Sequence, residues 1–386
     1  MSWSIAPVID WMMHKGRHLQ TREEVVGGIC ERVRDAGLPI DRVAFFLWML
    51  HPQYAGVALF WDGAKVTMNL GEHGFQAREV YTNSPAARIA EGERVIRRRL
   101  EDPGCALDFP VLRELREQGM TDYVMAEVVF GSGVRNSVSL TTKRAGGFSD
   151  HDIAEVQRLL HPFALIMENF NNRDLARTLL ETYLGRISGS RVLDGQIKRG
   201  DGEELDAVIW FSDLRDSTPL SRSLGERRFL ELLNDYFEAT AGAVLEHGGE
   251  VLRFIGDASL AVFPTSREAP RAACTRAVAA ARAARDRARE SNAKRRQAGL
   301  PPFACGIGLH LGRVLYGNIG TPNRLEFSVI GAAANEAARI EALCKETGRD
   351  IVLSGTVAAQ LGESWPSLGK FELRGVTQPM EVFALP

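Results

Sequence analysis

The sequence predicts a mixed α/β protein made of two folded blocks that a helical connector joins. Its 386 residues exceed the size of one typical domain. Helical and strand-like periodicities alternate along both halves. Between the halves, an apolar stripe at helical spacing is followed by several glycines, from Gly185 to Gly202. We therefore expect blocks at residues 1–165 and 204–386, with the connector at 166–203.

The first block begins with a helix and continues mainly as strands. Thr21–Ala36 has helical periodicity, with its apolar side chains on one face. A turn at Gly146–Asp150 precedes a second helix, which Ser149 or Asp150 can cap. Strands are predicted for four stretches, namely Val43–Leu50, Gly56–Trp61, Val124–Phe130 and Asn136–Thr141.

This order of strands, a Gly-Gly-Phe-Ser turn at 146–149 and a closing helix resembles the end of a GAF-type sensor domain. The resemblance implies that residues 1–165 form an α/β sensor that responds to a small molecule or a protein. The input is not identified, because the sequence of this block holds no metal-ligand cluster and no haem motif.

The connector carries one apolar stripe, in which large apolar residues recur every three to five positions. Two interpretations fit this spacing: a parallel coiled coil, or an amphipathic helix packed on its own domain. The stripe consists of Phe163, Ile166, Phe170, Leu175, Leu179, Tyr183 and Ile187.

The second block alternates strands and helices around a central hairpin. Ala207–Phe211 is a continuous apolar run, which is typical of a strand buried on both faces. Pro219 starts a helix that continues through Phe237. Further elements are the hairpin strands Val251–Ile255 and Ser259–Phe263, the helix Ala269–Arg296 and the strand Ala304–Leu311. This alternation predicts an α/β sandwich.

The composition disfavours several classes of protein. With 47 Lys and Arg against 49 Asp and Glu, the net charge of −2 gives none of the basic excess typical of nucleic-acid binding. The apolar stretch Val43–Leu50 is far too short to span a bilayer, and the first residues do not resemble a signal peptide. The 5 cysteines form no C-x-x-C pair, so we expect reduced thiols in a cytoplasmic protein.

Two aspartates of the second block follow or connect predicted strands. Asp213 follows the buried strand and precedes the Ser217-Thr218-Pro219 helix start. Asp257 lies at the tip of the hairpin. Each alone is an ordinary loop or turn residue. Together, carboxylates on adjacent strand ends predict a divalent-cation site, and the neighbouring helix N-terminus offers amide donors to a phosphate.

A third element adds donors for a phosphate group. Asn335 and Arg339 are four residues apart, so they share one face of a predicted helix. Such a pair can donate hydrogen bonds to an oxyanion that develops at a phosphorus centre. Taken alone, it would be an ordinary surface pair.

In order along the chain, these residues lie in motifs that resemble the class III nucleotidyl cyclases. The motifs are Phe211-Ser-Asp-Leu-Arg-Asp-Ser-Thr218, Gly248-Gly-Glu-Val-Leu-Arg-Phe-Ile-Gly-Asp257, Gly317-Asn-Ile-Gly320 and Phe327-Ser-Val-Ile-Gly331 with Asn335 and Arg339. The resemblance covers residues 204–386, and it implies the ferredoxin-like α/β sandwich of that family, here of the bacterial soluble type.

The resemblance implies a role for each matching residue. Asp213 and Asp257 would hold two Mg²⁺ or Mn²⁺ ions, with the backbone carbonyl of Leu214 as a further ligand. Asn335 would orient the ribose, and Arg339 would stabilise charge on the α-phosphate. In this family the site lies between two catalytic domains, so the resemblance implies a homodimer. The resemblance also implies contacts to the base and the triphosphate from Arg253, Ser328, Leu214, Ser217 and Thr218.

Several positions depart from the family pattern, including Ala334 in place of a Val before Asn335, and three of them concern the base and the phosphates. Arg253 stands where the adenylate cyclases usually have Lys, and Ser328 stands where they have Asp or Thr. Arg253 can donate to adenine N1 and Ser328 can accept from the adenine amine, but Arg can also donate to guanine O6. Asp216 replaces a glycine of the phosphate loop, where its charge would oppose the triphosphate.

These residues predict an adenylate cyclase that converts ATP to 3′,5′-cyclic AMP and pyrophosphate under control of the N-terminal sensor. The alternatives are a guanylate cyclase and a weakly active or non-catalytic nucleotide-binding sensor. A diguanylate cyclase is disfavoured, because Gly248-Gly249-Glu250 is followed by Val251 and Leu252 and lacks the second acid and the Phe of that signature.

Overall fold

The computed structural model describes residues 3–265, 269–362 and 365–385. The chain divides into two compact units, residues 1–179 and 180–386. The division falls inside the segment that we assigned to the connector. Within the described ranges, no helix combines the length and the apolar character that crossing a membrane requires. The five cysteines are free thiols, as expected.

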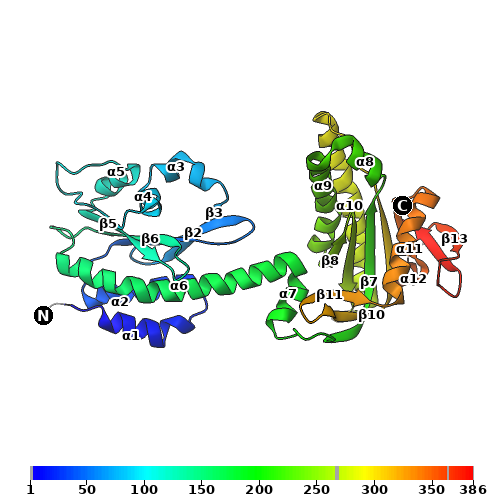
Figure 1. Ribbon diagram of the computed structural model, residues 1–386, viewed down its shortest axis with the longest axis horizontal. Helices are drawn as coiled ribbons and strands as arrows, with labels where there is room; N and C mark the ends of the chain where they lie inside the picture. The colour runs from blue at the N-terminus through cyan, green and yellow to red at the C-terminus, as the bar shows by residue number, and fades with distance from the viewer. Residues whose placement is uncertain (1–2, 266–268, 363–364, 386) are drawn as a thin grey trace. The chain divides into compact units, whose positions relative to one another are not determined.

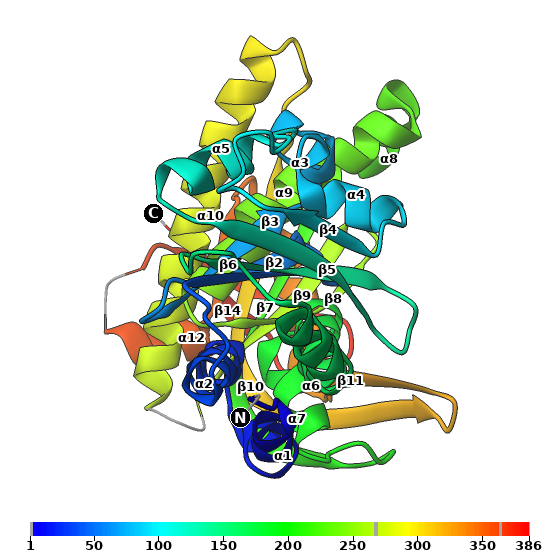
Figure 2. The same cartoon turned by 90° about the vertical axis from the view of Figure 1, so that its left-hand side faces the viewer.

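The first unit is built on a six-stranded antiparallel sheet with the strand order β3-β2-β1-β6-β5-β4. Figures 1 and 2 show α1, α2 and α6 on one face of this sheet and α3, α4 and α5 on the other. The helices are α1 (Ala6–His14), α2 (Arg22–Ala36), α3 (Glu79–Thr82), α4 (Pro85–Glu91), α5 (Pro110–Glu117) and α6 (Asp150–Leu184), with short 3₁₀ turns η1 (Gly16–His18) and η2 (Phe75–Ala77). The strands are β1 (Arg42–Trp48), β2 (Tyr54–Trp61), β3 (Val66–Glu72), β4 (Val95–Arg98), β5 (Asp122–Val129) and β6 (Arg135–Thr142).

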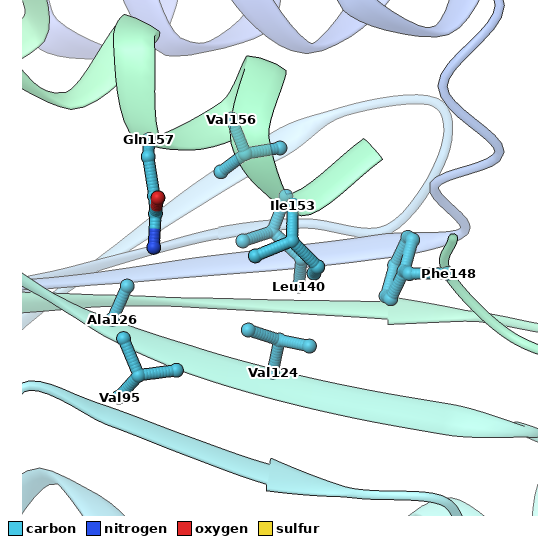
Figure 3. A pocket seen from close by; sticks show the side chains of 8 residues that line it. All are labelled: Val95, Val124, Ala126, Leu140, Phe148, Ile153, Val156 and Gln157. Carbon is cyan, nitrogen blue, oxygen red and sulfur yellow. The ribbon is translucent and has the colours of Figure 1, made fainter. Parts of the chain in front are cut away.

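Alternation along the strands separates two cores in this unit. Inward residues such as Phe45, Leu59 and Val138 pack against α1, α2 and α6. Figure 3 shows Ile153 and Val156 of α6 pointing toward Leu140 of β6. The opposite face packs against α4 and α5 in a separate, smaller core. The predicted helix at 21–36 and the four predicted strands are confirmed to within two residues at each end.

The apolar stripe of the connector is not one continuous contact surface. Ile166 and Phe170 of α6 are buried in the core of the first unit, whereas Ile187 packs against the sheet of the second. Between them, Leu179 and Tyr183 are exposed. The first part of the stripe is therefore an amphipathic helix packed on its own domain. The exposed part is the segment that a parallel coiled coil would use.

The second unit is built on an eight-stranded sheet with the strand order β13-β14-β12-β10-β7-β9-β8, and β11 pairs with β10. Its strands are β7 (Gly202–Leu214), β8 (Glu250–Ile255), β9 (Ala258–Pro264), β10 (Cys305–Thr321), β11 (Arg324–Ile330), β12 (Ile351–Ser354), β13 (Ser367–Phe371) and β14 (Met380–Ala384). Its helices are α7 (Arg186–Leu193), α8 (Ser217–Leu224), α9 (Glu226–Glu246), α10 (Pro270–Gln297), α11 (Ala332–Thr347) and α12 (Gly355–Leu361).

Helices cover both faces of this sheet, so the predicted mixed α/β architecture is confirmed. Val208 and Trp210 of β7 point toward α9, α10 and α12. The alternate residues Ala207 and Ile209 point toward α11 and toward β11, which curls over that face. β10 pairs antiparallel with β7 and with β11, and parallel with β12.

One predicted helix is wrong in its start and its continuity. The chain becomes helical at Ser217 rather than Pro219, and the helix ends at Leu224. Gly225 has a positive φ of 73° and an extended ψ of 166°, a combination outside the α-helix that glycine adopts readily, and α9 begins directly after it. The single predicted helix is therefore two helices, α8 and α9.

Candidate active site

The two predicted metal aspartates lie at the same end of neighbouring strands. Asp213 is the penultimate residue of β7, and it pairs in register with Ala258, the first residue of β9. Asp257 immediately precedes Ala258 in the tight turn from β8 to β9. The structure therefore brings the two side chains together, as the spacing of the motifs predicts.

The two carboxyl groups affect each other electrostatically. Burial raises the pKa of the Asp213 carboxyl, and the nearby Asp257 carboxylate raises it further, with the two groups within hydrogen-bonding reach. The backbone N–H of Leu214 donates to Asp213 and opposes this shift. Two adjacent carboxylates without a cation repel each other, and oxygen ligands of this kind suit Mg²⁺ or Mn²⁺. The residues present thus fit the expected metal ions.

Additional ligands must come from elsewhere. In the described part of the chain, no group of three or more His, Cys, Asp or Glu side chains could hold a metal ion. Mg²⁺ is commonly bound by one or two carboxylates together with water and the phosphates of the substrate. A two-aspartate site with a backbone carbonyl such as that of Leu214 matches this pattern.

A buried hydroxyl network fixes the strand ends behind the aspartates. The Ser212 Oγ lies 2.8 Å from the Ser259 Oγ, which links β7 to β9. The Tyr236 hydroxyl of α9 donates to the Ser212 Oγ at 3.0 Å. All three side chains are fully or almost fully buried. The positions of Asp213 and Asp257 therefore rest on a rigid framework rather than on a free loop.

The segment between β7 and α8, which we predict to be a phosphate loop, has a backbone conformation at position 216 that glycine adopts readily. Asp216 has a φ of 55°, and no other non-glycine residue in the described ranges has a positive φ. Glycine adopts this left-handed conformation freely, and Asp is among the few other residues that tolerate it. The Asp216 side chain is exposed and makes no capping hydrogen bond within those ranges. Ser217 and Thr218 form the first residues of α8.

The two predicted base-reading residues lie on different strands. Arg253 is an exposed residue of β8, and Ser328 is a buried residue of β11. The Arg253 Nε lies 3.0 Å from the Glu326 Oε1, so an ion pair joins β8 to β11. Glu326 and Ser328 share one face of β11, because side chains two apart on a strand point the same way. The motifs quoted above do not include Glu326. The alternation of side chains along a strand could have revealed it, because Glu326 lies two residues before Ser328.

Asn335 and Arg339 are one turn apart on α11. Asn335 is exposed and Arg339 is half-buried. Among the described residues, neither side chain has a hydrogen-bonding partner, and no interaction links either one to Asp213 or Asp257. The structure therefore does not complete the expected site within one chain.

α11 lies directly on β10, and glycines make this possible. A Cβ at Gly308 would lie 2.5 Å from the backbone nitrogen of Glu341 and 2.7 Å from the Ala337 carbonyl oxygen. A Cβ at Gly306 would overlap the Glu341 side chain. Gly306 is also the register partner of Asp213. The glycines thus place Glu341 near Asp213, one of the two predicted metal ligands.

Glu341 is a site residue that the motifs did not single out. Burial, with the charge of Asp213, raises the pKa of Glu341 to about 7, and Arg215 opposes this shift. The side chain therefore adds a third carboxyl group near the aspartate pair. A sequence signal existed, because Glu341 lies four residues after the buried Ala337 and faces the sheet side of α11.

The helix α7 is anchored to this sheet by a buried carboxylate. The Glu250 Oε1 of β8 accepts hydrogen bonds from the Ser188 backbone N–H at 2.7 Å and from the Ser188 Oγ at 2.9 Å. The Tyr316 hydroxyl of β10 donates to the Glu250 Oε2 at 2.8 Å. A Cβ at Gly185 would lie 2.9 Å from this carboxylate. The connector therefore meets the strand that carries Arg253 and leads to Asp257.

A family model matches this region, over somewhat less than half of the chain. Residues 202–386 match the model described as the adenylate and guanylate cyclase catalytic domain. The matched range begins at the first residue of β7. It contains every residue for which we expect a role in metal binding, substrate binding or catalysis.

Similar proteins include the uncharacterized proteins Rv1318c and Rv1320c of Mycobacterium tuberculosis, which are 32% and 34% identical to this chain over 242 residues. These alignments cover 61% of this chain and 42% and 40% of the relatives, so the chain spans less than half their length. Among solved structures, the guanylyl cyclase Cya2 is 32% identical, with a TM-score of 0.43, and the match covers 47% of this chain and 92% of that one. The adenylyl cyclase CyaB from P. aeruginosa is 22% identical, with a TM-score of 0.44 and coverages of 48% and 95%.

Proposed function

We propose that this chain, whose residues 202–386 match the model of the adenylate and guanylate cyclase catalytic domain, converts ATP to 3′,5′-cyclic AMP and pyrophosphate. The observation that carries the proposal is the pair of adjacent carboxylates, Asp213 and Asp257, at one end of the sheet. This pair is combined with the donors Asn335 and Arg339, which are left without partners among the described residues of their own chain.

In the proposed reaction, the ribose 3′-oxygen attacks the α-phosphorus, and the bond from this phosphorus to the bridging oxygen of the β-phosphate breaks. Pyrophosphate leaves with that bonding pair, and the proton of the 3′-hydroxyl passes to solvent. Metal ions bound by Asp213, Asp257 and the Leu214 carbonyl would supply charge neutralisation and a lowered pKa of the 3′-hydroxyl. Arg339 would donate to the α-phosphate oxygens, where negative charge increases in the transition state, and Asn335 would hold the ribose.

We infer that the working unit is a homodimer with two shared sites. Cyclase catalytic domains bind nucleoside triphosphates and work as dimers. In this chain, no interaction among the described residues joins Asn335 or Arg339 to the aspartates. In a head-to-tail pair, each site would combine the aspartates of one protomer with the α11 donors of its partner.

The choice of base depends on Arg253, Ser328 and Glu326. For ATP, the Arg253 guanidinium would donate to adenine N1, and Ser328 would accept from the exocyclic amine. The ion pair with Glu326 favours the guanylate alternative, because Arg and a carboxylate side by side complement guanine O6 and its N–H donors. Guanylate cyclase is therefore the second candidate function.

The test is a turnover assay of the purified full chain with Mn²⁺ and each triphosphate, in which chromatography separates the two cyclic nucleotides. We expect cyclic AMP and pyrophosphate from ATP. Faster formation of cyclic GMP from GTP at equal concentration would overturn the base assignment. Nucleotide binding without any product would overturn catalysis, and it would favour a nucleotide-binding sensor, to which the charge of Asp216 would contribute.

Substitution of Glu326 by glutamine separates the two bases. Glu326→Gln is expected to lower turnover of GTP about tenfold and to change turnover of ATP less than about threefold, since one base-edge contact discriminates by about 1–3 kcal/mol. The measurement is kcat/KM for both triphosphates. Glu231→Gln, an exposed residue of α9, is the control. An equal loss for both triphosphates would exclude a role of Glu326 in base selection.

We propose further that the N-terminal unit controls the reaction through α7. The supporting contact is the buried Glu250 carboxylate, which holds Ser188 of α7 and Tyr316 of β10. A change in the helical connector would act at this point on β8, whose far end leads to Asp257.

Removing this carboxylate is expected to release α7. Glu250→Ala removes the acceptor of the Ser188 backbone N–H and of the Ser188 and Tyr316 hydroxyls, at a cost of about 2–3 kcal/mol, and leaves the two hydroxyls, 2.6 Å apart, one hydrogen bond between them. Hydrogen–deuterium exchange of peptides from 186–193 should accelerate at least about tenfold, and the cyclase rate should change with it. Peptides from α2 are the internal control. If hydrogen–deuterium exchange in 186–193 is unchanged, Glu250 does not anchor α7. If exchange becomes faster but the cyclase rate is unchanged, α7 does not transmit a signal to the active site.

A further inference from the structure

The sheet of the first unit has one filled face and one hollow face. On the α6 side, the hollow that Figure 3 shows has a volume of only about 10 Å³. On the opposite face, below η2, α3 and α4, a cavity of about 790 Å³ lies over β1, β2, β5 and β6. Ligand pockets in proteins have volumes of about 300–1,000 Å³, so this cavity is of the size that holds a small organic molecule.

The hollow arises from small side chains on the sheet. Gly56 and Ala58 of β2 and Ser137 and Ser139 of β6 line the cavity, whereas their neighbours Val57 and Val138 fill the core of the other face. A close-packed interior does not leave such a volume by chance, because each missing contact costs dispersion energy. The small residues therefore reserve space above the sheet.

Aromatic side chains form both ends of the cavity. At one end, Trp48 lies against Phe75 with ring centroids 5.5 Å apart, and Phe75 lies against Tyr81 at 5.1 Å. At the other end, Phe46 and Phe60 meet edge to face at 5.8 Å. Such walls favour a ligand with an apolar, ring-containing body.

Several polar side chains line the cavity, and the one that distinguishes it is the guanidinium of Arg42, at the start of β1. Its Cζ lies 5.5 Å from the Phe60 ring centroid. Burial lowers the pKa of Arg42, although Tyr123 and Glu114 favour its charge. Among the described residues, no carboxylate forms an ion pair with Arg42 and no acceptor hydrogen-bonds its guanidinium. Two other arginines of the lining are paired, Arg78 with Glu72 and Arg135 with Glu127.

A partly buried charge without a counter-charge is costly, and an anionic ligand would offset that cost. We propose that this cavity binds a small organic anion, with its carboxylate, sulfonate or phosphate on Arg42 and its ring-containing body along Phe46 and Phe60. This site lies wholly within the first unit. The inference therefore does not depend on the proposed cyclase activity, and it supplies the chemical class of the input to the chain.

The test uses two fluorescent probes of similar body and different charge, measured on the full chain without nucleotide. 8-Anilinonaphthalene-1-sulfonate carries an anionic group, and N-phenyl-1-naphthylamine is its neutral counterpart. We expect Arg42→Gln to weaken binding of the sulfonate at least about tenfold and binding of the amine less than about twofold. Arg135→Gln, which removes a paired arginine of the same lining, should change neither by more than about twofold.

A second variant locates the probes. Ala58→Phe places a ring in the hollow and should weaken both probes, while circular dichroism verifies the fold. Energy transfer from tryptophan to the bound sulfonate should decrease in Trp48→Phe, because Trp48 lines the cavity. Equal binding of the two probes with no effect of Arg42→Gln would overturn the anion preference. Unchanged binding in Ala58→Phe would overturn the cavity as the site.

Discussion

Replacing Asp213 by asparagine is expected to reduce cyclic nucleotide formation by about 10³-fold or more while the chain stays folded. A bound metal ion contributes several kcal/mol to the stabilisation of such a transition state, and about 4 kcal/mol corresponds to about 10³ in rate. Asn keeps the shape of Asp but not its charge, so Asp213→Asn removes the ligand without opening a cavity. The measurement is kcat with Mn²⁺ and ATP.

The matched control is Asp206→Asn on the same strand. Asp206 is an exposed residue of β7, and its side chain pairs with Arg313 at the surface, far along the strand from Asp213. Its substitution should leave the rate within about twofold, because exposed ion pairs contribute about 0–1 kcal/mol. A comparable loss of activity in both variants would mean that β7 as a whole, and not the Asp213 carboxylate, is needed.

Asp213→Asn is expected to lower activity but to preserve or raise the thermal stability of the metal-free protein. Asp213 is partly buried beside Asp257, and both burial and this neighbour disfavour its charge. In metal-free protein, Asp213→Asn removes that repulsion, so thermal unfolding should occur at the same temperature or higher. With Mn²⁺ present, the wild type should gain stability that the variant does not gain. A variant that unfolds earlier without metal would contradict this account of the site.

Much of the candidate site could be predicted from the sequence because its signals are local. Asp213 lies two residues after the apolar run Ala207–Phe211, and Asp257 occupies a tight turn between two short strands. Such patterns place both residues at strand ends, and the strand order then makes these ends neighbours. Asn335 and Arg339 are likewise related by helical period alone.

The errors have identifiable physical causes. The predicted strand at 304–311 stops before Gly312, but β10 continues to Thr321. Gly312 is not a break, because a Cβ there would lie 2.6 Å from the Ala333 Cβ of α11. The glycine serves packing between a strand and a helix that are distant in sequence. Gly225, by contrast, does end an element, because its backbone conformation divides α8 from α9.

Contacts between distant segments could not be predicted either. Glu326 belongs to the candidate site because it pairs with Arg253, and Glu341 because it lies near Asp213. Both contacts join segments that only the folded sheet brings together. The cavity of the first unit is similar, because Gly56, Ala58 and two serines are ordinary strand residues until the sheet places them side by side. The sequence shows such residues one at a time, whereas a site depends on their juxtaposition.

Mixing two inactive variants is expected to restore activity if the site is shared between protomers. Asp257→Asn removes a metal ligand, and Arg339→Ala removes the donor to the α-phosphate, so each variant alone should lose at least about 10²-fold in rate. In a mixed dimer, one site combines both defects. The other site combines the intact Asp257 of one protomer with the intact Arg339 of its partner.

The activity expected for the mixture follows from the number of intact sites in the mixed dimers. When equal amounts of the two variants exchange freely, half of the dimers are mixed, and each mixed dimer has one intact site of two, so activity should approach about a quarter of the wild-type rate. Exchange is verified with two differently tagged wild-type chains. If exchange occurs and the mixture stays as inactive as its components, Asp257 and Arg339 act within one chain. Since no contact among the described residues joins them there, that result would require Arg339 to approach Asp257 of its own chain during the reaction.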